Sequence, residues 1–260
     1  MNAKPVAQPD TTIEFRSVEY RVAGTSRGAI LIDISLKIAR GETLVLLGRS
    51  GSGKTTLLKL INGLLTASAG EVLVNGRLVR EWDSIRLRRG IGYVIQDAGL
   101  FPHYNVARNV GLVPALEKWE PSRIASRVEE MMQLVGLNPQ EYSERKPREL
   151  SGGQRQRVGV ARALAADPPI LLMDEPFGAL DPVTRAELQR EFAELAARLA
   201  KTIVFVTHDL REALRLGSRI VLLEAGRIVA DAPPREFLHV EHPEVRAFAA
   251  SFEVKSEVRA

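Results

Sequence analysis

Apolar and polar residues alternate along two stretches near the N-terminus, Thr12–Val22 and Ala29–Ala39. A period of two turns one face of a strand toward the core and the other toward water, so both stretches are predicted to be antiparallel strands. Residues Glu71–Val74 and Arg77–Val79 flank an Asn-Gly dipeptide, the strongest short-range signal for a hairpin. The first part of the chain is therefore expected to contain an antiparallel β subdomain.

A second pattern, short continuous apolar runs, predicts strands that are buried on both faces of a parallel sheet. Helical segments separate the runs, beginning with Thr56–Leu65, and Asp181 followed by Pro182 is a typical helix start. This alternation indicates an α/β fold. The runs are Thr43–Leu47, Ile91–Ile95, Ile170–Met173, Thr202–Thr207 and Arg219–Leu223.

Between Asp97 and Asp167 the strand pattern stops, and the sequence becomes mostly helical with breaks at prolines. After Pro233 and Pro234 a short helical tail is expected. We therefore predict one domain over residues 1–260. Its α/β core would occupy about 12–96 and 168–232, an inserted α-helical subdomain about 97–167, and the tail about 233–260.

Composition excludes several classes of site and partner. Hydrophobic residues make up 45% and charged residues 26% of the chain, as in an ordinary globular protein. There is no cysteine, which excludes disulfides and thiolate metal sites. The net charge of +4 is modest, and the longest basic cluster, Arg86–Arg89, is interpreted as a solvated face. No nucleic-acid partner is expected.

No segment reaches the roughly 18–20 apolar residues that a membrane-spanning helix needs. The polar N-terminus, Met1–Asp10, lacks the pattern of a signal peptide. The chain is therefore expected to be cytosolic.

A glycine-rich segment between the strand Thr43–Leu47 and the helix that follows it has the pattern of a phosphate-binding loop. Its glycines let backbone N–H groups point at phosphates. Lys54 would reach the β- and γ-phosphates, and the hydroxyl of Thr55 would bind Mg²⁺. The segment is Gly48, Arg49, Ser50, Gly51, Ser52, Gly53, Lys54 and Thr55.

Two carboxylates, Asp174 and Glu175, end the apolar strand Ile170–Met173. Asp174 is placed to hold Mg²⁺, directly or through water, and Glu175 would lie near the γ-phosphate, where it can polarise the attacking water. Adjacent residues of a strand point to opposite faces, but Pro176 supports a turn at this point. The alternative is a solvated acidic strand end.

A second anion site of different design follows about a hundred residues after the first, in Leu150–Gln154. A serine, two glycines and a glutamine ahead of a basic helix offer a hydroxyl, backbone N–H groups and a helix N-terminus to a phosphate. Two such sites in one short chain suggest a nucleotide held between two copies. The sequence here resembles the ATP-binding subunits of ABC transporters, for which this five-residue motif is nearly diagnostic.

The resemblance covers about Ile13–Phe252, with the motifs in the family's order, and implies two ATP molecules and Mg²⁺ in a head-to-tail dimer. It implies that Glu175 is the catalytic base, that His208 contacts the γ-phosphate, and that Gln96 senses Mg²⁺ or water. It implies that Tyr20 stacks on adenine, although a tyrosine packed on the core is the alternative. The implied nucleotide-binding residues are Tyr20, Gly48, Arg49, Ser50, Gly51, Ser52, Gly53, Lys54, Thr55, Thr56, Ser151, Gly152, Gly153, Gln154, Asp174 and Asp181, with Thr55, Gln96 and Asp174 at the metal.

A finer resemblance, to importer ATPases for glycine betaine, choline and related osmoprotectants, rests on Gly92–Gln96, Gly99–His103 and the region of Asn109–Trp119. It implies a second copy or a paralogous ATPase subunit, transmembrane permease subunits, an indirect solute-binding protein, and a place on the cytoplasmic face of the membrane. Asp97 stands where a second glutamine is often found. The chain ends at Ala260 without room for the C-terminal regulatory domain of many such subunits, which puts that route of regulation in doubt.

The segment Gly99–Val113 is predicted to be the surface on which the permease docks. It follows Gln96 and carries Leu100 and Phe101 beside Pro102, an apolar pair on a proline-stiffened loop. The alternative is that this pair packs on the chain's own helices.

Three other functions stay open or are excluded by particular motifs. The chain could serve an importer of another solute, such as an amino acid, because the solute never touches this subunit. An ABC ATPase that acts on nucleic acid or the ribosome usually carries a coiled coil, zinc modules or tandem cassettes, which are not seen here. A P-loop kinase or GTPase would not explain Leu150–Gln154 and His208.

Overall fold

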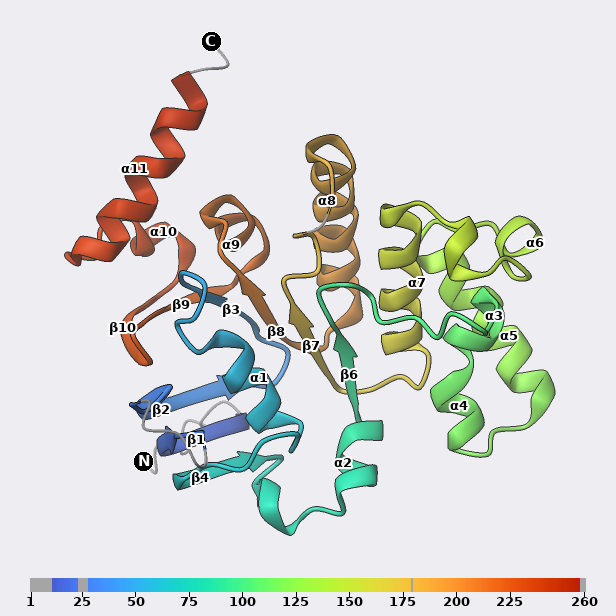
Figure 1. Ribbon diagram of the computed structural model, residues 1–260, viewed down its shortest axis with the longest axis horizontal. Coiled ribbons are helices and arrows are strands. Elements are labelled where there is room, and N and C mark those ends of the chain that lie inside the picture. The colour runs from blue at the N-terminus through green and yellow to red at the C-terminus, as the bar shows by residue number, and fades with distance from the viewer. Residues whose placement is uncertain (1–10, 23–27, 179, 258–260) are drawn as a thin grey trace, which may run out of the picture. The chain divides into compact units, whose positions relative to one another are not determined.

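The structure is a computed structural model that describes residues 11–22, 28–178 and 180–257, with side chains described up to residue 250. Its chain forms two compact units, one of residues Met1–Leu87 and His208–Ala260 and one of residues Arg88–Thr207. Figure 1 shows the elements of both. Each unit combines strands with helices, as the α/β pattern of the sequence predicts.

The first unit contains an antiparallel sheet whose strands are ordered β2-β1-β4-β5. Both predicted strands are confirmed, and burial alternates along β2 from Ile34 to Ile38; in β1 the alternation is interrupted at the exposed pair Arg16 and Ser17, where the register with β2 shifts. The predicted hairpin is also confirmed: Val74 pairs with Arg77, and the turn residues Asn75 and Gly76 have φ values of 51° and 73°. The strands are β1 (Thr11–Tyr20), β2 (Leu31–Ala39), β4 (Ala69–Val74) and β5 (Arg77–Leu78).

The same unit contains β3 (Thr43–Leu47), parallel to β9 (Arg219–Glu224), and β10 (Arg227–Ala232), antiparallel to β9. Strand β10 was not predicted, because its alternation is weak and its alanines add little apolar signal. It forms as a hairpin partner of β9 around a turn at Ala225 and Gly226, whose φ values are 46° and 79°.

Helices of the first unit connect these strands. The predicted helix Thr56–Leu65 begins two residues earlier, at Lys54, and ends at Ile61. The predicted C-terminal helical tail is confirmed as two helices. The helical elements are α1 (Lys54–Ile61), η1 (Val79–Glu81), α2 (Ser84–Arg89), α9 (Leu210–Leu216), α10 (Pro234–Phe237) and α11 (Pro243–Glu257).

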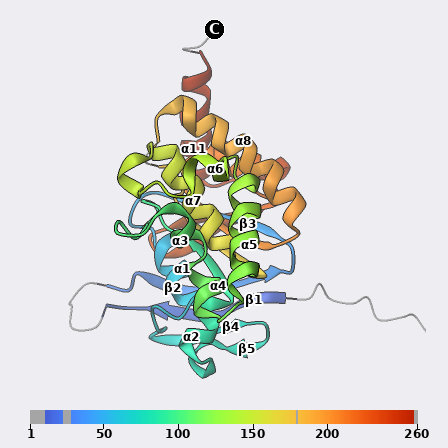
Figure 2. The same ribbon diagram turned by 90° about the vertical axis from the view of Figure 1, so that its right-hand side faces the viewer.

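The second unit contains the parallel strands β6 (Ile91–Val94), β7 (Ile170–Asp174) and β8 (Thr202–Thr207), with β7 in the middle. Helices α3, α5 and α7 pack together in this unit, as Figures 1 and 2 show. This confirms the mostly helical stretch predicted from Asp97 to Asp167. The helical elements are α3 (Val106–Val110), α4 (Leu112–Leu116), α5 (Pro121–Leu134), α6 (Pro139–Tyr142), η2 (Pro147–Glu149), α7 (Gly152–Leu164) and α8 (Pro182–Leu199).

Every residue of β7 and of β8 is buried, as continuous apolar runs predict. Three aromatic rings, of Phe177, Phe192 and Phe205, pack beside them with centroids 5.8–6.2 Å apart. Burial of a phenylalanine side chain contributes about 1.5–3 kcal/mol, so this cluster rigidly supports the carboxyl end of β7. That end carries Asp174 and Glu175.

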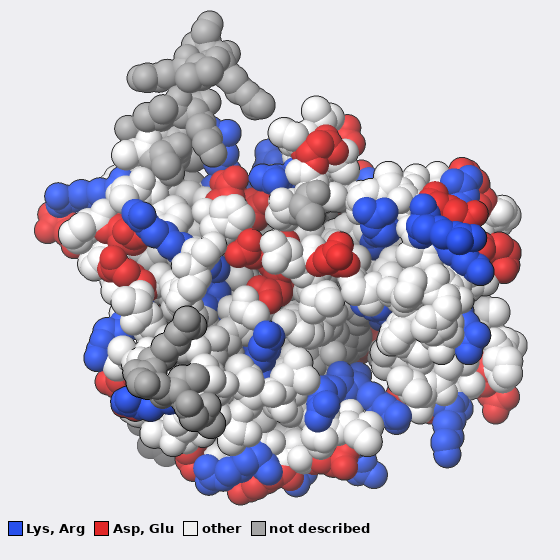
Figure 3. Space-filling model, in the orientation of Figure 1, with Lys and Arg blue, Asp and Glu red and all other residues white. Residues whose placement is uncertain are grey.

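The surface mixes charges of both signs. Basic and acidic side chains are interspersed on the face shown in Figure 3. Arg86 and Arg88 of the predicted basic cluster are exposed, which agrees with a solvated face. Over the described ranges, no helix combines the length and the apolar character needed to cross a membrane.

Candidate nucleotide site

The loop between β3 and α1 has glycines where a side chain would collide. A Cβ on Gly48 would lie 2.4 Å from the carbonyl oxygen of Leu223, so the loop can follow β9 closely only with glycine here. Gly53, the N-cap of α1, has a φ of 106°. The glycine pattern of the sequence therefore reflects close backbone approach at one end of the loop and left-handed backbone at the other.

Lys54 lies inside this loop with only 4% of its surface exposed. Its Nζ atom donates hydrogen bonds of 2.8 Å to the carbonyl oxygens of Gly48 and Arg49. The hydroxyl of Ser52 is buried with no protein partner. A buried cation, an unsatisfied hydroxyl and the N-terminus of α1 together form a set of groups suited to phosphate oxygens.

His208 lies beside this loop in the folded unit. It lines an open hollow of about 350 Å³ together with Arg49, Ser50, Ala247 and Phe248. The fold thus brings the predicted histidine to the predicted phosphate loop, although almost 160 residues separate them in the sequence. Tyr20 lies at the end of β1, half-buried and paired with Leu31, and its stacking role stays a prediction.

Asp174 and Glu175 occupy the carboxyl end of β7. The hydroxyl of Tyr93 donates to Asp174 Oδ2 at 3.4 Å, and burial together with this carboxylate raises the pKa of Tyr93 well above its usual range. Asp174 is buried, and Glu175 has a φ of 44°. Left-handed backbone at a non-glycine residue costs of order 1 kcal/mol, and it provides the turn that the sequence predicted after the strand.

Gln96 follows β6 in the same unit. A Cβ atom on Gly178 would lie 3.5 Å from Gln96 Nε2 and 3.7 Å from Glu175 Oε2. The predicted base and the predicted glutamine sensor are therefore brought together, and a glycine at 178 leaves room for both. The residue after it, Ala179, lies outside the described residues.

Ser151 and Gln154 form a capping box at the N-terminus of α7. Ser151 Oγ accepts from the backbone N–H of Gln154 at 3.2 Å, and Gln154 Oε1 accepts from the backbone N–H of Ser151 at 2.8 Å. The Gln154 amide also donates to the Tyr142 hydroxyl at 3.1 Å. A Cβ on Gly153 would lie 2.6 Å from Thr184 Cγ2, so this glycine lets α7 approach α8. The motif is a preformed helix end.

Asp181 caps α8, as the sequence predicted. Its Oδ1 atom accepts from the backbone N–H groups of Val183 and Thr184 at 3.2 and 3.1 Å. Hydrogen bonds from Thr184, first its side chain and then its backbone, lower the pKa of Asp181. The carboxylate is exposed, so the cap leaves it accessible to a second molecule.

Arg162 of α7 is a functional candidate that sequence reasoning missed. Its guanidinium donates to the carbonyl oxygens of Ala98 and Gly99 at 2.6 and 2.8 Å, and burial lowers its pKa. It ties the helix that begins with Ser151–Gln154 to the turn that follows Gln96. The sequence does carry a signal for this residue: Arg162 lies one helical turn from the apolar residues Val158 and Ala165, both of which are buried.

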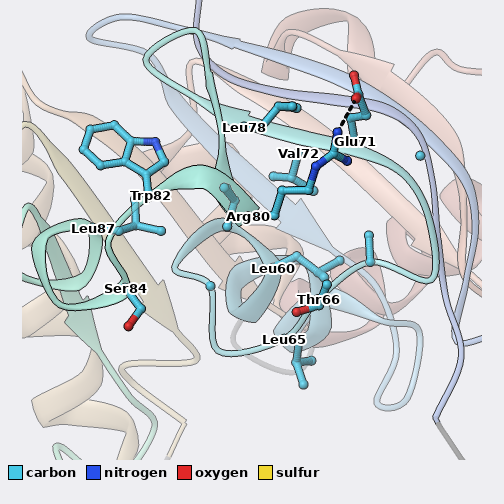
Figure 4. A pocket seen from close by; sticks show the side chains of 14 residues that line it. Leu60, Leu65, Thr66, Glu71, Val72, Leu78, Arg80, Trp82, Ser84 and Leu87 are labelled. Atoms are coloured by element: carbon cyan, nitrogen blue, oxygen red, sulfur yellow. Dashed lines mark hydrogen bonds and ion pairs between the residues drawn. The ribbon is translucent and has the colours of Figure 1, made fainter.

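A second cavity, of about 240 Å³, lies in the first unit among α1, β4, β5, η1 and α2 (Figure 4). Leu60, Val72, Trp82 and Leu87 are among its lining residues, and Trp82 Nε1 is buried with no protein partner. No residue predicted from the sequence to bind nucleotide lines this cavity. The candidate nucleotide-binding groups are therefore those of the loops described above, each within its own unit.

Sequence relatives agree with this geometry. The choline transport ATP-binding protein OpuBA of Bacillus subtilis is 53% identical over 206 residues, 79% of this chain and 54% of the relative. The glycine betaine uptake system ATP-binding protein YehX of Escherichia coli is 52% identical over 206 residues, 79% of this chain and 67% of the relative. The chain spans about half the length of most of the curated relatives it matches first.

A solved structure and a family model also match this chain, and both belong to ABC transporters, as the sequence relatives above do. The dimeric ATP-binding cassette MJ0796 in a post-hydrolysis state, bound to ADP and Pi, superimposes with a TM-score of 0.76 at 33% identity, covering 86% of this chain and 99% of that one. The α/β fold with antiparallel and parallel sheets and added helices is thus that of an ABC ATPase. The family model for ABC transporters matches residues 31–178. The chain belongs to the ABC transporter family.

Proposed function

We propose that this chain is the ATP-hydrolysing subunit of an ABC importer, and that the importer carries glycine betaine, choline or a related osmoprotectant. The observation that carries the ATPase part is the loop Gly48–Thr55, which encloses a buried lysine and an unsatisfied hydroxyl beside a helix N-terminus. An ATP phosphate would supply a hydrogen-bond partner for the hydroxyl of Ser52 and a negative charge beside Lys54. Thr56, in the first turn of α1, extends the same surface.

Mg²⁺ would be held by Thr55, Asp174 and Gln96 together with phosphate oxygens. Within the described ranges no group of three or more His, Cys, Asp or Glu forms a metal site by itself. Mg²⁺ typically uses one or two carboxylates plus the substrate's phosphates and water, so this donor set fits it. When bound, the ion neutralises the charge on the phosphates.

Glu175 would accept the proton of the attacking water, and His208 would hold the γ-phosphate from the side of Arg49 and Ser50. The left-handed backbone at Glu175 turns its side chain out of the strand's alternation, toward the position shared with Gln96. A base held this way needs little rearrangement before it orients water.

The second copy would supply Ser151, Gly152, Gly153 and Gln154. In one chain the side chains of Ser151 and Gln154 already satisfy each other's backbone N–H groups. What the capping box leaves is a rigid helix end with its positive dipole toward the outside. This end suits a γ-phosphate presented by another copy, with Asp181 as a further contact across the dimer. ATP-driven closure would then move the permease subunits.

The permease would dock on Gly99–Val113, at the cytoplasmic face of the membrane. Buried Asn109 organises this segment: its Oδ1 accepts from the N–H of Phe101 at 2.8 Å, and its Nδ2 donates to the carbonyl oxygens of Phe101, Tyr104 and Asn105. The loop thereby presents Phe101, 42% exposed and packed against the rings of His103 and Tyr104. An exposed aromatic cluster on a rigid loop suits a partner's helix.

The first experiment tests hydrolysis with Glu175→Gln. A glutamine orients water but accepts a proton poorly, so turnover should fall at least about a hundredfold while ATP affinity stays within about twofold. The purified variant should become dimeric with ATP. The exposed Glu187 on α8 offers the control Glu187→Gln, which should behave as wild type. Wild-type turnover in Glu175→Gln would show that Glu175 is not the base.

The second experiment tests docking and substrate in reconstituted vesicles that contain the permease and the solute-binding protein. Phe101→Ser should leave the ATPase of the isolated subunit intact and lower uptake of glycine betaine at least about tenfold, since interface anchors contribute about 2 kcal/mol or more. Leu116→Ser is the control, because Leu116 is 49% exposed but lies on α4, outside the loop. Normal uptake with Phe101→Ser would contradict the docking site, and wild-type vesicles that ignore all quaternary amines would contradict the substrate class.

A further inference from the structure

The phosphate loop is joined to the C-terminal helix α11 by an ion pair that spans 195 residues of sequence. Arg49 Nε donates to Glu244 Oε1 at 2.5 Å, and Arg49 Nη2 donates to Glu244 Oε2 at 3.2 Å. Both residues belong to the first unit. A two-point contact of this kind fixes orientation as well as distance, because the guanidinium and the carboxylate are both planar.

Glu244 is buried at the start of α11, with 9% of its surface exposed, and its neighbour Val245 is fully buried. The backbone N–H of Glu244 donates to His242 Nδ1 at 3.3 Å, and the His242 ring lies 3.8 Å from Glu224 at the end of β9. A buried carboxylate is costly unless it is paired, although its place in the first helical turn favours a negative charge. The guanidinium of Arg49, whose side chain is 71% exposed, therefore offsets part of the cost of burying the Glu244 carboxylate.

Arg49 is held from its other side by the loop. Its carbonyl oxygen accepts a 2.8 Å bond from Lys54 Nζ, while its guanidinium is bound by α11. The phosphate loop and α11 also line the same hollow: the loop contributes Arg49 and Ser50, and α11 contributes Ala247 and Phe248. A shift of α11 would therefore move the residue that helps to orient the phosphate-binding lysine.

We propose that Glu244 is a positioning residue for the phosphate loop, and that docking of α11 and binding of ATP phosphates to the loop are coupled through Arg49. This inference rests on the proposed function of the loop as an ATP site. It gives α11 a role that the sequence motifs do not assign to it. Because coupling between two binding events is reciprocal, each should strengthen the other by the same factor.

Affinity measurements on the full chain test the first half of this coupling. Arg49→Ala and Glu244→Ala should each raise the Kd for ATP about 3- to 10-fold, as expected for loss of a charged pair whose carboxylate is buried and whose guanidinium is largely exposed. Glu244→Gln keeps one acceptor oxygen, so its Kd for ATP should lie between those of wild type and Glu244→Ala. The double variant should bind ATP no more weakly than the single variant with the higher Kd, since both substitutions remove the same contact. Effects that multiply would contradict the proposal.

Amide hydrogen exchange tests the second half. In wild type, saturating ATP should slow amide exchange at residues 245–250 by about the factor by which Glu244→Ala raises the Kd for ATP; the slowing should be smaller in Glu244→Gln and absent in Glu244→Ala. A purely structural role would change exchange equally with and without ATP. Glu241→Gln, an exposed carboxylate just before α11, is the matched control and should match wild type in both measurements.

The controls separate failure of this inference from failure of the proposed function. If Lys54→Ala keeps full ATP affinity, the loop is not the ATP site and the proposed function is wrong. If Lys54→Ala loses affinity while Glu244→Ala and Arg49→Ala do not, the loop binds ATP without help from α11. In that case the positioning role is overturned and the ATPase proposal stands.

Discussion

The loop Gly48–Thr55 and the motif Ser151–Gln154 both place backbone N–H groups at a helix N-terminus, but they differ in how they are held. The loop depends on close backbone approach at Gly48 and encloses the buried cation of Lys54. The motif is exposed at Ser151 and is closed on itself by a capping box. We therefore expect the enclosed loop to bind phosphate within one chain, and the exposed helix end to contribute when a second copy brings a phosphate to it.

Of the two regions, the loop should show the largest effect, at Lys54. This effect would confirm that the loop binds ATP without a second copy of the chain. Lys54→Ala should raise the Kd for ATP of the isolated subunit about 10- to 100-fold, because it removes a charge-assisted contact to phosphate. Lys59→Ala in the same helix is the control and should leave the Kd unchanged. Isothermal titration calorimetry measures both. If the two variants bind alike, the enclosed cation does not explain the difference between the two regions.

A smaller effect on turnover, with none on monomer affinity, is expected at Ser151. Ser151→Arg should fill the space for the partner's γ-phosphate and lower ATP turnover about tenfold or more, while the Kd of the monomer stays within about twofold. Mixed dimers with Glu175→Gln would show which of the two sites is blocked. Loss of monomer affinity would mean that the motif acts within its own chain.

The smallest effect concerns the capping box itself. Gln154→Ala removes the acceptor for the N–H of Ser151 and should lower the free energy of unfolding by about 1 kcal/mol without changing monomer ATP affinity. Urea denaturation measures the first quantity and calorimetry the second. Gln133→Ala, at an exposed position of α5, should change neither. An unchanged stability for Gln154→Ala would show that the reciprocal bonds do not hold this helix end.

Much of the site could be predicted because its parts are local. The phosphate loop needs a buried strand, a glycine pattern and a helix start in immediate succession, and all three are visible in the sequence. The same is true of Asp181, whose capping role depends on the next three residues. The predicted strands were confirmed wherever their own apolar pattern was strong, and β10 was missed because pairing with β9 stabilises it.

Contacts between distant segments could not be predicted in this way. Periodicity says which face of an element is apolar, but it does not say which other element covers that face. The bonds from Arg162 to Ala98 and Gly99, and from Arg49 to Glu244, join positions 63 to 195 residues apart. The local sequence can indicate that Arg162 lies on an apolar helix face and that Arg49 lies in a phosphate loop, but it does not indicate which distant groups these two arginines contact.

The sequence by itself thus determined the fold class, the ABC motifs and their order. The motifs consist of residues close together in the chain, and the fold class follows from the periodicity of apolar residues. Only the tertiary structure decided that His208 lies beside Ser50, that Glu175 leaves the strand with left-handed backbone beside Gln96, and that α11 is joined to the phosphate loop. These features depend on how buried elements pack, and packing selects among partners that local pattern leaves equivalent.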